Sequence, residues 1–559
     1  MSHRSENAHR LELRLQSVPG GNHVHLFWLG AHPSAAALDC VRNTVETLGD
    51  QAVVAVLTTP QAAAMLLPDL ERDLQFQLWI AVKTSQVTTS TGRLPEQHAA
   101  LLILSKYRGA LRHTKTRIGY SYCPACGKTT KDYGGKKHTY HEYGTLMSDV
   151  WRDIAVNLQC DVSAVIDRLQ DLFGLDPHEA LVLHDWHTDL SQTVLAQPVA
   201  FNPVYPTPLQ DGLRNGNCLE ELTLVQDNSV DFCFADPPYN LKKRYDRWDD
   251  ALEIRDYFAW CDRWLSELAR VLKPGRTLAV LNIPLWTVRH FTRLSSLPGL
   301  RFQNWIAWEG LSLPVRMIMP AHYGVLCFSK GESRALPINS SNALEPLEDG
   351  YCLRAPCVQR RNRFERTDRS SLTDLWSDVH RVKHNSRRVN HPCQLPPALM
   401  TRLIGAFTMP DELVLDPFNG AGTTTLVAAQ LGRRYIGIEL SETYHELTKR
   451  RHAELETGID PFGKNDHVPA TKNNLVARVK PQRYKVSKKT LQLEVKRITQ
   501  GLGRIPTRDE VATHSTYPLQ YFDMYFKSWA EVTAAARTTG MTERPHLEIE
   551  QQTLFGNND

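Results

Sequence analysis

A strand, a glycine-rich turn, a helix and a second strand follow one another in "DELVLDPFNGAGTTTLVAAQLGRRYIGIEL" (411–440). The first apolar run ends at Asp416, and Gly420 and Gly422 then let the backbone turn tightly and approach a ligand closely. The second apolar run ends in Glu439, an acid placed to accept hydrogen bonds from ribose hydroxyls. This unit predicts a doubly wound α/β domain with a nucleoside site.

The glycine turn also narrows the choice of ligand. No lysine follows its last glycine, so it is not a phosphate-binding P-loop, and G-A-G-T-T does not fit the dinucleotide pattern G-x-G-x-x-G. A nucleoside without a pyrophosphate fits better, and S-adenosylmethionine (SAM) is such a ligand. The alternative is an ordinary tight turn, since many α/β turns contain two glycines.

The stretch "FADPPYN" (234–240) ends another apolar run abruptly. Two consecutive prolines remove two backbone N–H donors and fix φ at about −65°, so neither a strand nor a helix can continue. The stiff turn lies between an acceptor side chain, Asp236, and a flat ring, Tyr239. It is suited to hold a planar group that carries an amino nitrogen.

Apolar runs typical of strands and helices alternate from 201 to about 458. We expect a helix over 252–272, and strands over 277–283, 304–308 and 325–329. The predicted domains are an α/β region (1–200), the catalytic domain (201–458, with a candidate recognition segment at 331–390), a basic linker (459–486) and a small helical domain (487–545).

The composition predicts a cytoplasmic protein. No stretch approaches the ~18–20 apolar residues of a membrane span. The first residues, "MSHRSENAHR", are polar, and the eleven cysteines are scattered as in proteins of a reducing compartment. The net charge of +4 names no partner, but basic runs at 359–369 and 464–497 favour a polyanion over the alternative of solvated linkers.

"DPPY", "DPFNGAGTT" and "GIEL" together resemble the SAM-dependent amino-methyltransferases that act on exocyclic nitrogens of DNA bases. "DPPY" precedes the glycine loop, and this order resembles the β class, which places target recognition between the two motifs. The resemblance spans about 215–451. It implies a Rossmann-like methyltransferase domain, SAM as cofactor and double-stranded DNA as partner.

The resemblance also implies roles for individual residues. The catalytic residues would be Asp236, Pro237, Pro238 and Tyr239. The SAM-binding residues would be Asn217, Asp416, Phe418, Gly420, Gly422, Thr423, Glu439, His391 and Gln394. The DNA-binding residues would be Arg360, Arg361, Arg363, Arg387, Arg388, Lys488 and Lys489. Leu395 stands where the family usually has lysine, and Asn217 where it usually has aspartate.

The expected reaction is methyl transfer to the N6 amine of adenine. Asp236 and the Pro237 carbonyl would each accept one amino hydrogen, and the base would be flipped out of the duplex. The alternatives are N4-cytosine methylation and a DNA-binding regulator that retains an inactive methyltransferase fold. A restriction-modification or phage-defence partner is expected, while the oligomeric state is not readable.

Residues 493–537 resemble the short helical repeats found beside homing-endonuclease domains, through "LGRIPTRDEV", "YF" and "KSW". Such a unit would pack Trp529, Phe526 and Leu493 into a small core and present basic helices to DNA. The alternative is a structural cap on the enzyme.

"YCPACGK" has the turn spacing of a zinc knuckle, with Cys123 and Cys126 as candidate ligands. The remaining ligands would come from His138 and His141, or from Cys352 and Cys357 in the catalytic half. The alternative is a tight turn with two free thiols.

The first part of the chain echoes the catalytic half. "FQLWIA" (76–81) matches "FQNWIA" (302–307), "HAALLILSK" (98–106) matches "HYGVLCFSK" (322–330), and "MSDVWRDI" (147–154) matches "LTDLWSDV" (372–379). "HLFWLGAHPS" occupies the place of "DFCFADPPYN" but has no Asp-Pro-Pro-Tyr, and no second glycine loop follows. Residues 1–155 are therefore interpreted as a degenerate copy that packs on the catalytic domain as a built-in partner and contacts DNA. The alternative is an unrelated α/β domain.

Overall fold

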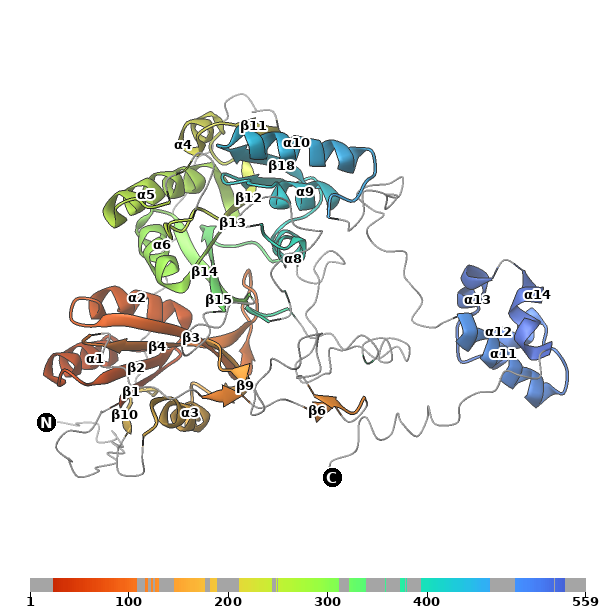
Figure 1. The fold of residues 1–559 in the computed structure, drawn as a ribbon, viewed down its shortest axis with the longest axis horizontal. Coiled ribbons are helices and arrows are strands. Elements are labelled where there is room, and N and C mark those ends of the chain that lie inside the picture. Colours follow the sequence, from red (N-terminus) through yellow and green to blue (C-terminus); the bar gives the residue numbers. More distant parts are fainter. Residues whose placement is uncertain are drawn as a thin grey trace, which may run out of the picture. The chain divides into compact units, whose positions relative to one another are not determined.

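The computed structural model describes residues 24–107, 116–118, 122–123, 126–129, 145–175, 181–188, 211–243, 248, 250–310, 321–337, 357, 372–377, 379, 394–462, 488–526 and 528–537. The chain forms two compact units. The first combines 1–117, 146–346 and 371–478, and the second combines 118–145, 347–370 and 479–559. Figure 1 labels the elements along the chain.

An eight-stranded sheet in the first unit carries both motifs, with strand order β11-β18-β17-β12-β13-β15-β14-β16. Its strands are β11 (Gly212–Asn215), β12 (Val230–Ala235), β13 (Leu272–Asn282), β14 (Leu300–Glu309), β15 (His322–Lys330), β16 (Leu375–Trp376), β17 (Leu413–Asp416) and β18 (Arg434–Glu439). Only β15 runs antiparallel to its neighbours among the described strands. Its helices are α4 (Cys218–Glu221), α5 (Ile254–Val271), α6 (Pro284–Ser296), α8 (Pro397–Phe407), α9 (Thr423–Gln430) and α10 (Glu442–Glu456), with a 3-10 turn at Leu222–Leu224. This confirms the predicted Rossmann-like fold.

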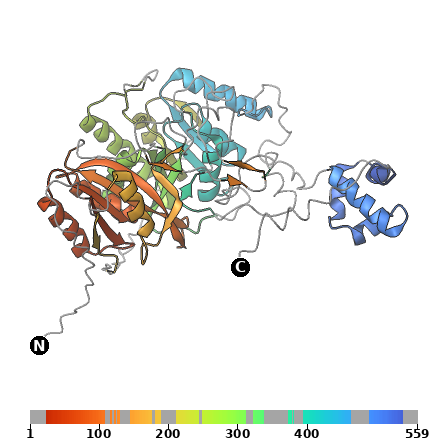
Figure 2. The same cartoon turned by 60° about the horizontal axis from the view of Figure 1, so that its bottom comes forward.

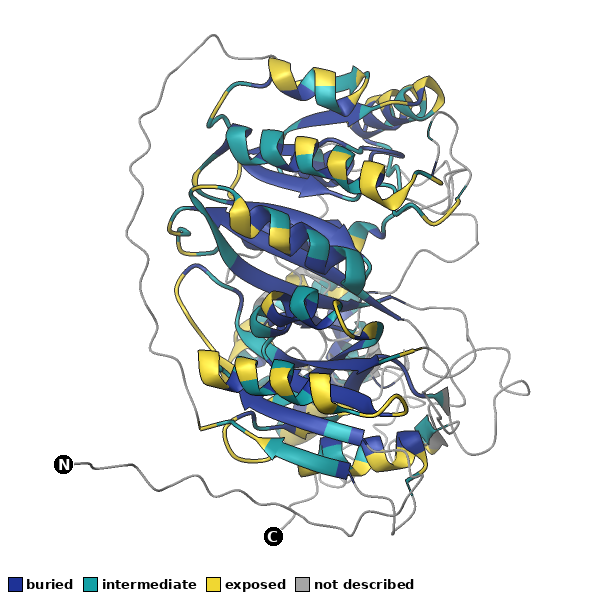
Figure 3. Cartoon of the chain, turned by 90° about the vertical axis from the view of Figure 1, so that its left-hand side faces the viewer, coloured by how far each residue is buried: buried dark blue, intermediate teal, exposed yellow. Residues whose placement is uncertain are grey.

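Helix α5 shows how the sequence builds this layer. It buries Tyr257, Trp264, Leu265 and Leu268 on one stripe, as an amphipathic helix against a sheet should. The helix ends at Val271, and β13 begins in the next residue. The strand therefore starts before the predicted bound, because the "KPG" tripeptide lies within it and does not form a separate turn. Figure 3 shows the buried strands between helices whose outer faces are exposed.

A six-stranded sheet lies in the N-terminal part of the same unit, with order β10-β1-β2-β4-β3-β9. Its strands are β1 (Val24–Gly30), β2 (Val53–Thr58), β3 (Gln75–Thr88), β4 (Glu96–Ser105), β9 (Val150–Val156) and β10 (Leu181–Asp185). Its helices are α1 (Ala35–Thr47), α2 (Pro60–Leu70) and α3 (Ser163–Phe173), the last drawn in gold across the strands in Figure 2. The short strands β5 (Arg117–Ile118) and β8 (Thr145–Leu146) form a separate pair.

The two sheets correspond strand for strand. The order β10-β1-β2-β4-β3-β9 matches β17-β12-β13-β15-β14-β16 in every pairing and every direction. The register agrees as well, since Trp79 pairs with Leu102 and Trp305 pairs with Leu326. The structure thus has the duplicated strands that the sequence echo predicts. It also extends the copy past residue 155, because α3 and β10 correspond to α8 and β17.

The repeated Ser-Lys pair at the end of β4 and β15 has the same role in both copies. The Lys330 ammonium donates to the carbonyl oxygens of Ala269 (2.8 Å) and Arg270 (3.0 Å), at the carboxyl end of α5. In the N-terminal copy, the Lys106 ammonium donates to the carbonyl of Leu48, directly after α1. A cation is favourable at a helix carboxyl terminus, which explains why both copies carry lysine here.

The two copies contact each other through equivalent residues. Asp374 accepts a hydrogen bond from the Gln97 backbone N–H (2.7 Å), and Asp149 accepts one from the Ala321 N–H (2.9 Å). Each aspartate belongs to one copy and each amide to the other. Between them, the rings of Trp79 and Trp305 stack with centroids 4.4 Å apart and planes 4° apart. The same patch from each copy therefore meets the other, as at a two-fold dimer interface.

The N-terminal copy has side chains where a ligand would lie. Gly30 ends β1 at the place of Asp236, so the acceptor carboxylate is missing. The ring of Trp28 stacks on His187 with centroids 3.9 Å apart, and the His187 Nδ1 lies 2.5 Å from Asp185. A Cβ on Gly30 would lie 2.7 Å from the His187 carbonyl oxygen. This packing fills the position equivalent to the end of β17.

The helical part of the second unit contains α11 (Lys488–Leu502), α12 (Arg508–His514), α13 (Leu519–Tyr525), α14 (Trp529–Val532) and a 3-10 turn at Thr533–Arg537. Its core is Leu491, Val495, Ile498, Val511, Phe522, Phe526 and Val532. Phe526 is in the core and Trp529 packs at its edge, as predicted, but Leu493 lies outside it. The helix presents Leu491 and Val495 inward, at a spacing of four, so the predicted helix phase was wrong at this position.

No helix in the described part of the chain is both long and apolar enough to cross a membrane.

We expect Trp79→Ala to lower the free energy of unfolding by about 3–5 kcal/mol, because it removes a fully buried ring from the contact between the two copies. Denaturant titration followed by circular dichroism measures the effect. The control is Met65→Ala on α2, whose side chain is 57% exposed and should change stability little. Equal effects of the two substitutions would contradict the packing described for Trp79.

Candidate active site

One pocket in the catalytic copy collects most of the predicted site residues. It lies where β12, β17 and β18 end, and its lining includes Asn217, Asp236, Pro237, Pro238, Tyr239, Gln394, Asp416, Phe418, Gly420, Thr423 and Glu439. Gly422 caps α9 directly behind the pocket. His391, Arg360, Arg361, Arg363, Arg387, Arg388 and the Lys489 side chain lie outside the described residues.

The Asp-Pro-Pro-Tyr turn is held by hydrogen bonds to two of its carbonyl groups. The Tyr257 hydroxyl donates to the Pro238 carbonyl (2.8 Å), and the Trp286 indole N–H donates to the Tyr239 carbonyl (2.9 Å). Within the described part of the chain, no hydrogen bond is made to the Pro237 carbonyl. The turn therefore keeps one carbonyl oxygen beside Asp236 for a ligand.

The residues after the turn are fixed by a buried carboxylate. Asp250, which is 2% exposed, accepts the backbone N–H groups of Asn240 (2.7 Å), Leu241 (3.0 Å) and Lys243 (2.9 Å). Asn240 has a left-handed φ of 56°, a conformation that asparagine tolerates better than most residues. Its side chain closes the loop by exchanging hydrogen bonds with the Leu252 backbone, both at 2.8 Å.

Aromatic rings surround the catalytic turn. The Tyr239 hydroxyl donates to Asp236 Oδ1 (2.8 Å), which fixes the ring beside the carboxylate. Tyr323 lies 6.3 Å from the Tyr239 ring and 5.3 Å from the Trp308 ring, between centroids. The Lys243 ammonium lies 5.5 Å from the centre of the Tyr239 ring. These groups offer flat faces at which a planar ligand can stack.

Sequence reasoning missed Trp308, Tyr323 and Lys243 as pocket residues. Trp308 and Tyr323 are on β14 and β15, and both strands were expected, but their position beside β12 and β13 follows only from the sheet order. Lys243 follows "DPPYN" closely in sequence, so its proximity to the motif was the available signal.

The glycine loop is tied to the tip of β18 through Glu439. One carboxylate oxygen accepts the Gly420 N–H (2.7 Å), and the other accepts the Ser441 N–H (2.8 Å). Gly422 has a φ of 78°, and a Cβ there would lie 2.4 Å from Thr448 Cγ2. Both the conformation and the space therefore require glycine at this position.

A second aromatic group lies on the other side of the pocket. The Phe418 ring is 5.5 Å from Trp260, and Trp260 is 4.4 Å from Trp248, between centroids. Asn217 lines the same pocket and caps α4, where its side-chain oxygen accepts the Leu219 N–H (3.1 Å). The asparagine that replaces the usual aspartate thus serves as a helix cap here.

Three carboxylates line the pocket: Asp236, Asp416 and Glu439. Burial raises the pKa of Asp416 to about 7, and the negative charges of Asp236 and Glu439 raise it further, against the lowering effect of hydrogen bonds from Thr424 and Phe418. Carboxylates that repel one another and lack water are stabilised when a cation enters. The pocket is therefore suited to a ligand that carries positive charge.

Comparison with known proteins agrees with this geometry. The family profile described as DNA methylase matches residues 230–450. The type II methyltransferase M.BamHI of Bacillus amyloliquefaciens is 36% identical over 338 residues, which are 59% of this chain and 77% of that protein. M.HpaI of Haemophilus parainfluenzae is 32% identical over 247 residues, which are 44% and 74% of the two chains.

One solved structure in the same comparison is a DNA modification methylase from Thermus thermophilus complexed with S-adenosyl-L-methionine. It is 26% identical, and the match covers 43% of this chain and 94% of that one, with a TM-score of 0.30.

The chain belongs to the family of SAM-dependent DNA amino-methyltransferases, which modify exocyclic nitrogens of adenine or cytosine. SAM is the cofactor of this family. Its sulfonium and ammonium groups are cations of the kind that the three carboxylates favour.

We expect SAM binding near pH 6.5 to release protons, because a cation in the pocket lowers the raised pKa of Asp416. Below pH 7 the empty site holds Asp416 partly protonated, so SAM affinity should fall as the pH drops further. Calorimetry in two buffers of different ionisation enthalpy measures the proton release.

The matched ligand is S-adenosylhomocysteine, which lacks the sulfonium charge and should release fewer protons. Asp416→Asn should remove the release. An unchanged proton release in Asp416→Asn would show that another group titrates.

Proposed function

We propose that this protein transfers the methyl group of SAM to the N6 amine of adenine in double-stranded DNA, within a restriction-modification or phage-defence system of the bacterial cytoplasm. The observation that carries the proposal is the pair of acceptors at the pocket, the Asp236 carboxylate and the Pro237 carbonyl, beside a cofactor loop. The type II methyltransferase relatives support the restriction-modification setting.

The two acceptors would make a poor nucleophile competent. The lone pair of an aromatic amine is delocalised into its ring. When Asp236 and the Pro237 carbonyl each accept one amino hydrogen, the nitrogen moves towards tetrahedral geometry and its lone pair points at the methyl group. SAM supplies a methyl group activated by the sulfonium charge, so the S–CH3 bond breaks as the N–CH3 bond forms. The methylated amine then loses one proton, and Asp236 is the adjacent acceptor.

The braces behind the turn support this geometry. Tyr257 and Trp286 fix the two following carbonyls, so the Pro237 oxygen cannot rotate away from the target. Holding the reacting groups in place supplies much of the acceleration in such a transfer. Glu439 would accept the ribose hydroxyls of SAM, and Phe418 would cover its adenine.

The target base must leave the duplex to reach the turn, which costs a few kcal/mol in lost stacking and pairing. Tyr239, Trp308 and Tyr323 would recover part of that cost by stacking on the flipped base. Lys243 carries a positive charge at the same rim, suited to a backbone phosphate.

Adenine is proposed over cytosine because the motif reads Asp-Pro-Pro-Tyr, a form that leans towards adenine in this family. N4-cytosine methylation is the alternative, since the same two acceptors would hold that amine. A non-catalytic regulator is disfavoured by the complete set of acceptors and by the glycine loop.

We expect DNA incubated with the protein and SAM to gain N6-methyladenine, measured by nucleoside mass spectrometry. Asp236→Asn should reduce the rate by at least about 100-fold, as expected when an oriented charged acceptor is removed, while SAM still binds. Glu46→Gln, an exposed position on α1, is the control. N4-methylcytosine would select the alternative, and full activity in Asp236→Asn would refute the assigned mechanism.

The helical part of the second unit is proposed to add DNA contacts. Within it, Lys488 pairs with Glu531 and lies over the Phe526 ring at 4.9 Å, so part of its charge is already compensated. Arg497, Arg504 and Arg508 likewise pair with acids of their own unit.

We expect deletion of residues 487–559 to weaken DNA binding and reduce its salt dependence. The slope of log K against log salt should fall by about 0.9 for each DNA phosphate that the shortened protein no longer neutralises. Fluorescence anisotropy across a salt series measures the slope, with SAM binding as the folding control. An unchanged slope would assign this segment a structural role only.

A further inference from the structure

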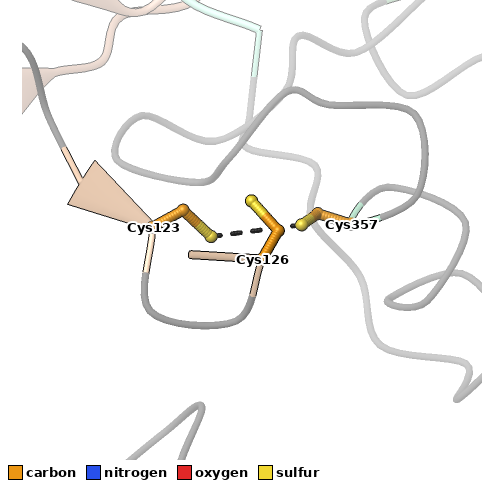
Figure 4. A group of neighbouring side chains, drawn as sticks. All are labelled: Cys123, Cys126 and Cys357. Atoms are coloured by element: carbon orange, nitrogen blue, oxygen red, sulfur yellow. Dashed lines mark hydrogen bonds between the residues drawn. The ribbon is translucent and has the colours of Figure 1, made fainter. Parts of the chain in front are cut away.

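Three cysteines converge in the second unit, two from the first part of the chain and one from the catalytic half. Cys123, Cys126 and Cys357 place their sulfur atoms within 4.8 Å of one another (Figure 4). The Cys123 and Cys357 sulfurs are 4.0 Å apart, and none of the three forms a disulfide. We propose that these thiolates bind one structural zinc ion.

The spacing of the sulfur atoms fits a metal better than a covalent bond. A Zn–S bond is about 2.3 Å, so two ligands of a tetrahedral site lie about 3.8 Å apart. The Cys123–Cys357 distance of 4.0 Å agrees with this value and is about twice a disulfide bond length. A disulfide would also use only two of the three sulfurs.

The local backbone presents both sulfurs of the Cys-x-x-Cys pair to one side. Strands β6 (Tyr122–Cys123) and β7 (Lys128–Thr129) form an antiparallel hairpin. The Gly127 N–H donates to the Cys123 carbonyl (2.9 Å), and Gly127 has a left-handed φ of 61°. A hairpin turn closed by glycine after the second cysteine has the spacing of a structural zinc ligand pair.

The third ligand comes from the candidate recognition segment. Cys357 is 4% exposed and lies between β15 and β16, whereas Cys123 and Cys126 lie between β4 and β9. These are equivalent positions in the two copies. The metal therefore joins the insertion of the degenerate copy to the insertion of the active one.

Zinc is the ion that this chemistry favours. Thiolate ligands select Zn²⁺ or Fe–S clusters over the hard cations, and a single tetrahedral site of this kind is a zinc site. The proposed role is to hold the recognition segment against its partner insertion, which a small segment cannot achieve with a hydrophobic core alone.

The test is the zinc content of the purified full-length protein by inductively coupled plasma mass spectrometry. We expect one zinc per chain in the wild type, and less than a tenth of that in Cys123→Ser and Cys357→Ser. Cys160→Ser, which changes an exposed cysteine elsewhere, should keep its zinc. Wild-type protein without zinc, or zinc retained in both ligand variants, would overturn the proposal.

Two further measurements guard against misfolded variants. SAM affinity reports on the first unit and should be unchanged in Cys123→Ser and Cys357→Ser. In the wild type, titration with an organomercurial should release one zinc as the ligand thiols react; thiols that react fully without releasing zinc would contradict the site. The sequence offers Cys352, His138 and His141 for the fourth position, and single variants identify which one lowers the zinc content.

Discussion

The contact between the two copies supports the arrangement of the whole first unit. Asp149 and Asp374 each accept a backbone N–H from the opposite copy, and both carboxylates are buried. Burial raises the pKa of Asp149 to about 8, so this group is largely neutral at neutral pH and its burial costs less than that of a charge. The stacked Trp79 and Trp305 rings lie in the same interface. Because β15 and β14 belong to both the interface and the pocket wall, the position of Trp308 and Tyr323 depends on this contact.

The duplication separates stability from catalysis. The N-terminal copy keeps the strand order, the helix-capping lysine and the interface aspartate, all of which serve packing. It lacks the groups that bind ligands: Gly30 replaces the acceptor carboxylate, and Trp28 and His187 pack together at the end of its strands. A fold can retain its shape after its site has disappeared, because core packing and site chemistry depend on different residues.

Local sequence predicted the parts of the site that are local in structure. The proline turn, the glycine loop and the acid at the tip of β18 each depend on a few consecutive residues, and all of them line one pocket. Trp308 and Tyr323 could not be found this way, because their place depends on which strands are neighbours. The phase of α11 was misjudged at Leu493, since several apolar residues lie close together there and only packing decides which of them faces inward.

The central claim is that one chain holds one working site and one inactive copy of it. Equilibrium dialysis with labelled SAM tests this most directly, because it counts sites without requiring DNA or turnover. The account predicts one SAM bound per chain, and none in Gly420→Val, whose side chain would obstruct the cofactor loop. Two molecules bound per chain, or one molecule still bound in Gly420→Val, would contradict it.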